Sequence, residues 1–153
     1  MSMFSHSVIV DPFGKLSADG KSKVWEGSVD IPALGQDFFI RIFGIETGPS
    51  QNQIKAFSQL LTNAVDLKQK STTPIINYLN KFSDIPQHST LSGLNVWQYL
   101  TPSFIEVHES NEYSAGQGKQ GEIAISIGFE VEWENVLLQI GTIDGKFHAI
   151  YTE

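Results

Sequence analysis

Seven glutamates in the C-terminal half form the largest group of side chains that could carry chemistry. They are Glu106, Glu109, Glu112, Glu122, Glu130, Glu132 and Glu134. Paired carboxyl groups can act as acid and base in glycoside hydrolysis, which needs an apolar pocket around one of them and an aromatic platform for the sugar. Trp133 falls on the apolar side of its predicted strand, so we expect it in the core. A small enzyme using paired carboxylates is therefore the alternative, and we expect a protein without catalytic residues.

Four of these glutamates belong to one predicted β-strand, the run GEIAISIGFEVEWE from Gly121 to Glu134. Alternate side chains of a strand point to opposite faces. The apolar face consists of Ile123, Ile125, Ile127, Phe129, Val131 and Trp133. The other face is small in the middle and acidic at the Trp133 end, which predicts a rigid row of carboxylates that meets a basic partner. A solvated edge that discourages pairing with other strands explains the same pattern without a partner.

The remaining motifs are explained by loops and surface strands. Gly116 to Gly121 match G-x-G-x-x-G, but a dinucleotide site needs a helix after this motif, and here a strand is predicted. Glu106 and His108 share one face of a predicted strand, yet two ligands are too few to hold a metal ion. The sequence has no D-x-[DN]-x-[DN]-G loop for Ca²⁺. We therefore expect no cofactor and no metal.

The negative charge is concentrated in one half of the chain. Residues 1–82 contain 8 Lys/Arg and 7 Asp/Glu, a net of +1, whereas residues 83–153 contain 2 Lys and 10 Asp/Glu, a net of −8. These sum to the overall −7. An acidic excess disfavours nucleic acid and anionic membranes as partners and favours a basic protein or a cation. Solubility alone explains the net charge as well as a partner does, but it explains the clustering less well.

Length and composition indicate one globular domain spanning residues 1–153. The apolar fraction is 41%, which is ordinary for a folded protein. The chain has no cysteine, and it shows neither a signal-peptide pattern nor an apolar run long enough to span a bilayer. We expect a cytoplasmic protein.

The order of the predicted elements favours an α+β fold, with a mainly antiparallel β-sheet and two consecutive helices packed on one face. The predicted strands are residues 13–16, 23–31, 37–45, 104–109, 122–133, 136–141 and 146–152. Asp19-Gly20 and Asp144-Gly145 predict hairpin turns. The spacing predicts one helix from a capping box at Ser50 and Gln53 to about Lys70, and a second one from Pro74 to Phe82. Residues 95–100 predict a helical turn.

Two details of packing decide where the carboxylates point. We expect residues 37–45 to be buried on both faces, and we expect a helix to pack closely over the small side chains of Ala124, Ser126 and Gly128. A β-bulge at Gly128 would shift the register and re-aim the carboxylates beyond it. Both registers stay open at this point.

The C-terminal half shows a proline-led strand, a glycine-ended loop, a strand that finishes near a Trp-acid pair, and a short hairpin. The residues that carry this pattern are Leu100–Ile105, Gly128–Glu134, Leu138–Gly141 and Asp144-Gly145, with Trp25–Gly27 as an N-terminal piece. The pattern covers about half of the chain and resembles that of a group of small, uncharacterised bacterial domains. Those domains often carry Glu-His-Gly after the tryptophan, whereas this chain has Asn135-Val136. Any site built on that histidine is absent here.

Such domains resemble immunity proteins encoded beside secreted bacterial toxins, including those of contact-dependent growth inhibition systems. The resemblance implies a protein that neutralises a cognate toxin, and many such toxins are nucleases with basic clefts. Complementary charge would speed association and set partner choice. The alternatives are the carboxylate enzyme and a scaffold subunit that assembles through exposed strand edges, and the oligomeric state is open.

The resulting hypothesis assigns the partner surface to the glutamates. Glu130, Glu132 and Glu134 would meet the basic cleft, flanked by Glu106, Glu109 and Glu112, with Tyr113 and Trp97 as aromatic anchors.

Overall fold

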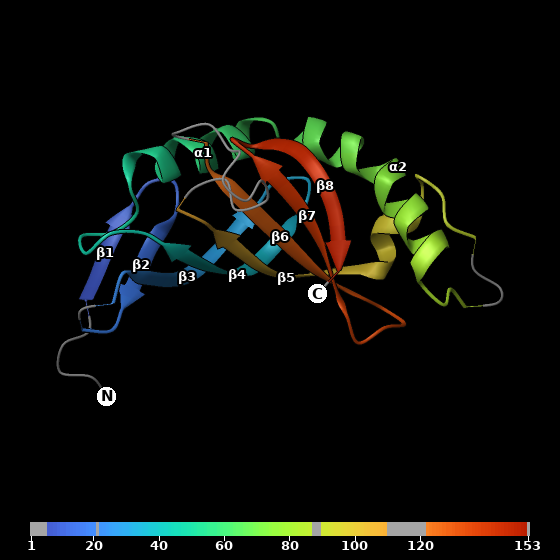
Figure 1. Ribbon diagram of the computed structural model, residues 1–153, viewed down its shortest axis with the longest axis horizontal. Coiled ribbons are helices and arrows are strands. Elements are labelled where there is room, and N and C mark those ends of the chain that lie inside the picture. Colours follow the sequence, from blue (N-terminus) through green and yellow to red (C-terminus); the bar gives the residue numbers. More distant parts are fainter. Residues whose placement is uncertain (1–5, 21, 87–89, 110–121, 153) are drawn as a thin grey trace.

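The computed structural model of the protein describes residues 6–20, 22–86, 90–109 and 122–152. Within these ranges the elements follow one another along the chain (Figure 1). They are β1 (His6–Val10), β2 (Gly14–Ala18), β3 (Val24–Ile31), β4 (Gly35–Phe43), α1 (Gln51–Thr62), α2 (Ala64–Phe82), the 3₁₀-helix η1 (Val96–Tyr99), β5 (Leu100–Val107), β6 (Ala124–Val131), β7 (Leu137–Ile143) and β8 (Lys146–Thr152). The predicted α+β class is confirmed.

The strands of the described residues form one sheet in which spatial order equals chain order, from β1 to β8. Neighbouring strands are antiparallel except for β4 and β5, which are parallel. A parallel pair cannot be joined by a tight turn and needs a crossover. Helices α1 and α2 and η1 supply that crossover, so the chain consists of two four-stranded meanders linked by a helical segment.

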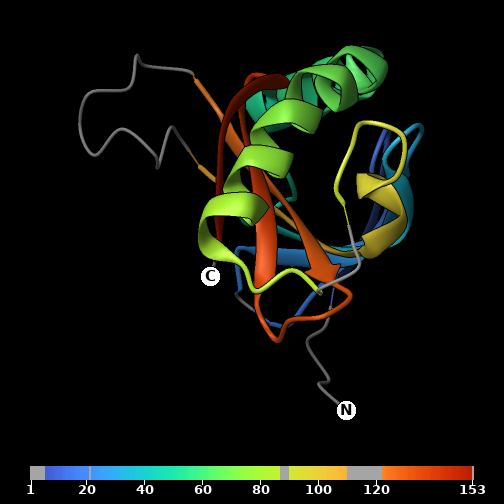
Figure 2. The same ribbon diagram turned by 90° about the vertical axis from the view of Figure 1, so that its right-hand side faces the viewer.

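Both helices lie on the same side of the sheet (Figure 1), and the sheet bends around them when seen along its long axis (Figure 2). The core lies between these layers. Ile40, Ile105 and Ile127 are aligned on neighbouring strands, and each is fully buried. From the helical layer, Phe57 of α1 stacks on Phe13 with ring centroids 4.6 Å apart. The opposite side of the sheet is called the open face below.

The helix boundaries differ from the prediction. The capping box is confirmed, because Gln53 N–H donates to Ser50 Oγ and Ser50 N–H donates to Gln53 Oε1. The first helix, however, ends at Thr62 with Asn63 as its C-cap, and not at about Lys70. The prediction missed this end because the apolar spacing continues unchanged into α2. Pro74 does not begin a helix but lies inside α2. The loss of one backbone hydrogen bond is offset by the burial of Leu67 and Leu79 on either side of it.

The strand β4 is buried on one face only, so the prediction of burial on both faces is wrong. Its inward residues Phe38, Ile40 and Ile42 are fully buried, whereas Phe39 is 45% exposed on the open face. The sequence does not reveal this alternation, because the outward-facing residue Phe39 is as apolar as its inward-facing neighbours. The strand β1, which the sequence did not predict, pairs with β2 at the edge of the sheet.

The small side chains of β6 face away from the helices, so the prediction that a helix packs over them is wrong. Ile125 and Ile127 point into the core, and alternation places Ser126 and Gly128 on the open face. An aromatic ring fills the space above Gly128, since a Cβ there would lie 2.1 Å from Phe104 Cε1. Small residues thus make room for a side chain of the neighbouring strand.

The structure also shows whether a β-bulge lies at Gly128. The pairing of β6 with β7 runs without a shift from Ala124 to Glu130, so Gly128 carries no bulge. The irregularity lies in β5, between Pro102 and Phe104. The carboxylate of Glu130 therefore keeps the face that simple alternation predicts.

The hairpin turn between β7 and β8 is confirmed. Asp144 and Gly145 both have positive φ, at 51° and 82°. Asp144 N–H donates to Ile123 O, and its carboxylate accepts from Ile123 N–H, both at 2.9 Å. The turn thus holds the start of β6. Among the described residues, no helix has the length and apolar character needed to cross a membrane.

Candidate functional site

The acidic end of β6 continues into the turn that leads to β7. Glu130 pairs with Thr101 of β5 on one side and Leu137 of β7 on the other, and its side chain is exposed on the open face. Glu132 follows in the turn and is also exposed. Within the described residues, neither carboxylate has a hydrogen bond or an ion pair with the protein. Both are therefore presented to solvent by a fixed backbone.

The backbone of this turn is fixed by η1. Glu132 N–H donates to Tyr99 O at 2.9 Å, and Glu134 N–H closes the turn on Val131 O at 3.0 Å. The rings of Tyr99 and Trp133 meet edge to face, with centroids 5.3 Å apart. This aromatic contact and the two hydrogen bonds thus hold the backbone that carries the two exposed carboxylates.

The end of α2 fixes the other side of the turn. Trp133 Nε1 donates to Ser83 Oγ at 2.7 Å, and Ser83 Oγ donates to Glu134 Oε1. Asp84 N–H donates to the same carboxylate at 3.2 Å. Glu134 therefore has a structural role within the fold, and it differs in this from Glu130 and Glu132. The prediction that Trp133 packs against the core is confirmed.

A hollow of about 350 Å³ lies at this turn. It is lined by Thr101, Glu130, Val131, Glu132, Glu134, Asn135, Val136 and Leu137. Three of these eight are glutamates, and no described lining residue is Lys, Arg or His. The lining also includes polar Thr101 and Asn135 and apolar Val136, so the hollow combines carboxylates, polar groups and some apolar surface. A cationic side chain fits this combination best. We call these eight residues the acidic hollow.

The other predicted glutamates lie elsewhere. Glu106 is in the middle of β5 on the open face, in register with Ser126, so about 13 Å of strand separates it from Glu130. Glu109 follows β5 and Glu122 precedes β6, at the end of the sheet opposite to the acidic hollow. The expectation that Glu106 and Glu109 flank the three C-terminal glutamates is wrong, because an antiparallel partner strand runs away from that end. Glu112 lies outside the described residues.

Of the two predicted aromatic anchors, Trp97 does not line the hollow. Trp97 is half-buried against the ring of Phe129, and its Nε1 donates to Thr72 Oγ1 at 3.0 Å, so it joins η1 to α2. Tyr113 and the G-x-G-x-x-G segment lie outside the described residues. Tyr99 is the aromatic residue beside the acidic turn. The sequence does not predict that Tyr99 lies there, because its position depends on the pairing of the start of β5 with the C-terminal end of β6.

His108 occupies a different environment from the one that a metal site requires. Its ring stacks on Phe43 with centroids 5.8 Å apart, and its Nε2 lies 3.5 Å from Ser126 Oγ. Where the structure describes the chain, no group of three or more His, Asp or Glu residues converges as metal ligands would. The histidine therefore belongs to the packing of the open face.

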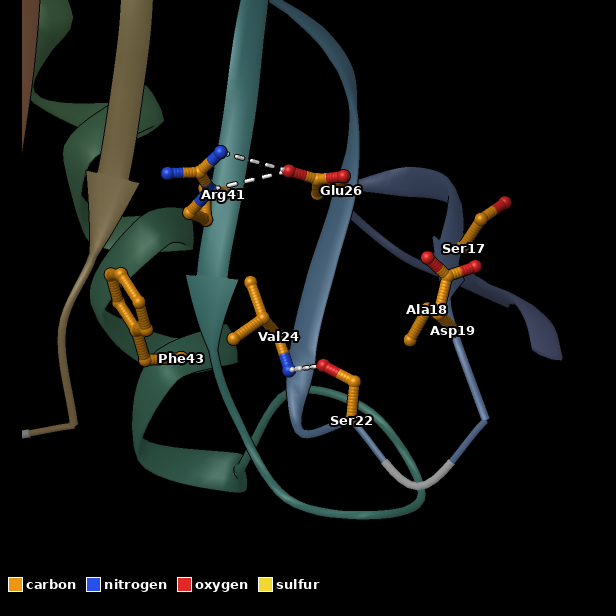
Figure 3. A pocket seen from close by; sticks show the side chains of 8 residues that line it. All are labelled: Ser17, Ala18, Asp19, Ser22, Val24, Glu26, Arg41 and Phe43. Atoms are coloured by element: carbon orange, nitrogen blue, oxygen red, sulfur yellow. Dashed lines mark hydrogen bonds and ion pairs between the residues drawn. The ribbon is translucent and has the colours of Figure 1, made fainter. Parts of the chain in front are cut away.

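A second hollow, of about 320 Å³, lies on the open face near β2, β3 and β4 (Figure 3). Two of its three charged residues form an ion pair, because Arg41 Nε and Nη2 both donate to Glu26 Oε2, at 3.2 Å and 3.1 Å, and the third is Asp19. Figure 3 shows this pair bridging the strands above Ser22, whose Oγ accepts from Val24 N–H. The second hollow therefore has one carboxylate in excess, whereas the acidic hollow has three, so the acidic hollow offers more to a cationic partner.

Fold and site together define a class of protein: an α+β domain with a sheet covered by helices on one face and an acidic surface at one end. The chain belongs to the family described as a domain of unknown function, DUF6985, whose model matches residues 12–135. The match covers the sheet from the β1–β2 turn to the acidic turn. No curated protein and no solved structure matches the chain.

Proposed function

We propose that this chain is a non-catalytic binding protein of the immunity type, which neutralises a cognate basic toxin domain through the acidic hollow. The observation that supports this most directly is the pair Glu130 and Glu132, two exposed carboxylates with no cation beside them in the described chain. A partner that brings lysine or arginine side chains would supply the missing charge.

The rigidity of the turn supports a binding role. Hydrogen bonds from Glu132 N–H and Trp133 Nε1 hold the backbone between η1 and α2, so the backbone that carries the carboxylates loses little freedom when a partner binds. Opposite charges on two rigid surfaces raise the association rate, and this effect weakens with salt because the Debye length is about 8 Å at physiological ionic strength. Val136 and Leu137 add apolar contact beside the charges.

The toxin that fits this surface has a basic cleft, as a nuclease does. An immunity protein must meet the toxin where the toxin acts, and for a nuclease this places the chain in the cytoplasm. Nucleic acid and anionic membranes do not fit as direct partners, because the C-terminal half would repel them.

The first test identifies the partner. The tagged full-length chain is used to capture proteins from its native cells at low salt, and the bound fraction is washed at high salt and identified by mass spectrometry. The proposal expects one stoichiometric basic protein that the salt wash removes. Recovery of an acidic or neutral partner that resists salt would contradict the acidic hollow as the binding surface.

The second test uses charge reversal with a matched control. The variant Glu130→Lys/Glu132→Lys should weaken binding to the captured partner at least about tenfold, mainly through the association rate. The control Asp19→Lys/Glu46→Lys changes net charge by the same amount at exposed positions in the other half of the chain. If both double variants lose affinity equally, net charge and not this surface controls binding. Affinity unchanged in the Glu130/Glu132 variant would remove the acidic hollow from the function.

A further inference from the structure

The two edges of the sheet are treated differently. At the β8 edge, α2 packs alongside the strand, and Tyr78 Oη and Thr152 Oγ1 are 2.8 Å apart, which ties the end of the strand to the helix. The pairing of β7 with β8 also contains an irregularity near Gly141, and β8 begins with Lys146. Charged residues, irregular pairing and a covering helix are the devices by which proteins keep an edge strand from pairing with another chain.

The β1 edge has none of these devices within its described residues. The strand reads His-Ser-Val-Ile-Val, with no lysine, proline or charged residue, and its register with β2 is unbroken from His6 to Val10. In antiparallel pairing, every second residue of an edge strand directs its N–H and C=O away from the sheet. Another extended backbone can pair with those groups and replace the water bound to them.

The side chains of β1 also favour an apolar neighbour. Ile9 is 86% exposed, one of the most exposed large apolar side chains in the described chain. It lies on the open face opposite Lys15 of β2. In an antiparallel strand pair centred on Val8, Ile9 would lie opposite Ser7 of the second copy, and the two Ile9 side chains would be diagonal neighbours, close enough for contact.

The distribution of charge favours a second copy of this chain as the occupant. Because strand order follows chain order, residues 83–153, with a net charge of −8, supply β5 to β8, whereas residues 1–50, with 4 Lys/Arg and 6 Asp/Glu and a net of −2, supply β1 to β4. Pairing through β1 keeps the two acidic halves at opposite ends of the combined sheet, whereas pairing through β8 would bring them together. A two-fold axis at β1 is therefore the arrangement with the least repulsion between copies.

We propose that two copies of this chain pair antiparallel through β1 to form one continuous sheet across both molecules. The arrangement leaves both acidic hollows at the outer ends, so a dimer presents two of them. The interface is small, since each strand contributes five residues, and we expect a reversible dimer with a dissociation constant in the micromolar range, roughly 1–100 µM. This inference does not depend on the identity of the toxin.

Sedimentation of the full chain over a range of concentrations tests the dimer. Ile9→Lys places two cations beside the two-fold axis and should raise the dissociation constant at least about tenfold. Leu94→Lys is the matched control, because Leu94 is 95% exposed and lies far along the chain from β1, before η1. A chain that stays monomeric at about 1 mM, or a dimer that both variants weaken equally, would overturn the proposal.

A distance measurement tests which edge is used. The chain has no cysteine, so a single Ser28→Cys on β3 carries one spin label per copy at an exposed position. Five strand spacings separate the labels in a β1–β1 dimer, about 24 Å, whereas eleven spacings separate them in a β8–β8 dimer, about 53 Å. The short distance supports the proposal, and the long one overturns it.

Discussion

Trp133 and Ser83, 50 residues apart in sequence, are joined by a hydrogen bond in which the indole Nε1 donates to the serine Oγ at 2.7 Å. Ser83 caps the C-terminus of α2, and Trp133 lies in the turn after β6. The hydroxyl in turn donates to Glu134 Oε1. One serine therefore connects the helical layer to the acidic turn.

Ser83→Ala should lower the free energy of unfolding by about 1–3 kcal/mol, because it leaves the partly buried indole N–H without its acceptor. Urea denaturation measures the change. Ser58→Ala in α1 is the control, since the Ser58 hydroxyl has no hydrogen bond to a described residue and alanine favours a helix. Equal effects of the two substitutions would show that the connection through Ser83 contributes nothing.

Replacement by alanine should destabilise the fold at Glu134 and have little effect on stability at Glu132. Glu134→Ala removes an acceptor of two hydrogen bonds and should cost about 1–3 kcal/mol of stability. Glu132→Ala should change stability by no more than about 0.5 kcal/mol, because its carboxylate is exposed and unbonded within the described chain. Denaturation curves of both variants, combined with binding of the captured partner, separate structure from recognition. The assignment fails if Glu132→Ala is the more destabilising of the two.

The order and type of most elements could be predicted from alternation and turn residues. The Asp144-Gly145 hairpin and the strands on either side of it illustrate this, because both signals are local. The break at Asn63 could not be predicted, because helical spacing passes through it. Pro74 misled the prediction because tertiary packing of α2 outweighs a local helix-breaking signal.

The candidate site could be predicted only in part, for a related reason. Glu130 and Glu132 are found by alternation along one strand, which is a local property. The placement of Glu106 depends on the direction and register of β5 against β6, which a single sequence does not contain. The structural role of Glu134 depends on Ser83, and that contact spans two layers of the fold.

Alanine substitutions at two glycines with positive φ, Gly14 and Gly145, distinguish the cost of backbone strain from the cost of a steric clash. Gly14 has φ of 77° with open space where a Cβ would lie, whereas Gly145 has φ of 82° and a Cβ there would lie 2.5 Å from Leu60 N of α1. Gly14→Ala should cost about 1–2 kcal/mol for the left-handed backbone alone. Gly145→Ala should cost at least about 2 kcal/mol more, because the helix backbone must move. Urea denaturation compares them, and equal costs would show that α1 does not press on this turn.

Gln53 joins the start of α1 to two strands, and its replacement by glutamate should be strongly destabilising. Its side chain is 1% exposed, and its Nε2 donates to Phe43 O at 2.8 Å and to His108 O at 3.1 Å. A carboxylate in this place cannot donate, and it would set a buried negative charge against two carbonyl oxygens, so Gln53→Glu should cost about 3–5 kcal/mol.

The same substitution two residues earlier should have the opposite sign. Gln51 is exposed at the first position of α1, where a negative charge interacts favourably with the helix dipole, so Gln51→Glu should stabilise by about 0.3–1 kcal/mol. Both variants make the same change in net charge, and chemical denaturation at neutral pH compares them directly. A small or favourable effect of Gln53→Glu would mean that the carbonyl groups of Phe43 and His108 do not depend on this donor. The joint between α1 and the central parallel strands β4 and β5 would then rest on apolar packing alone.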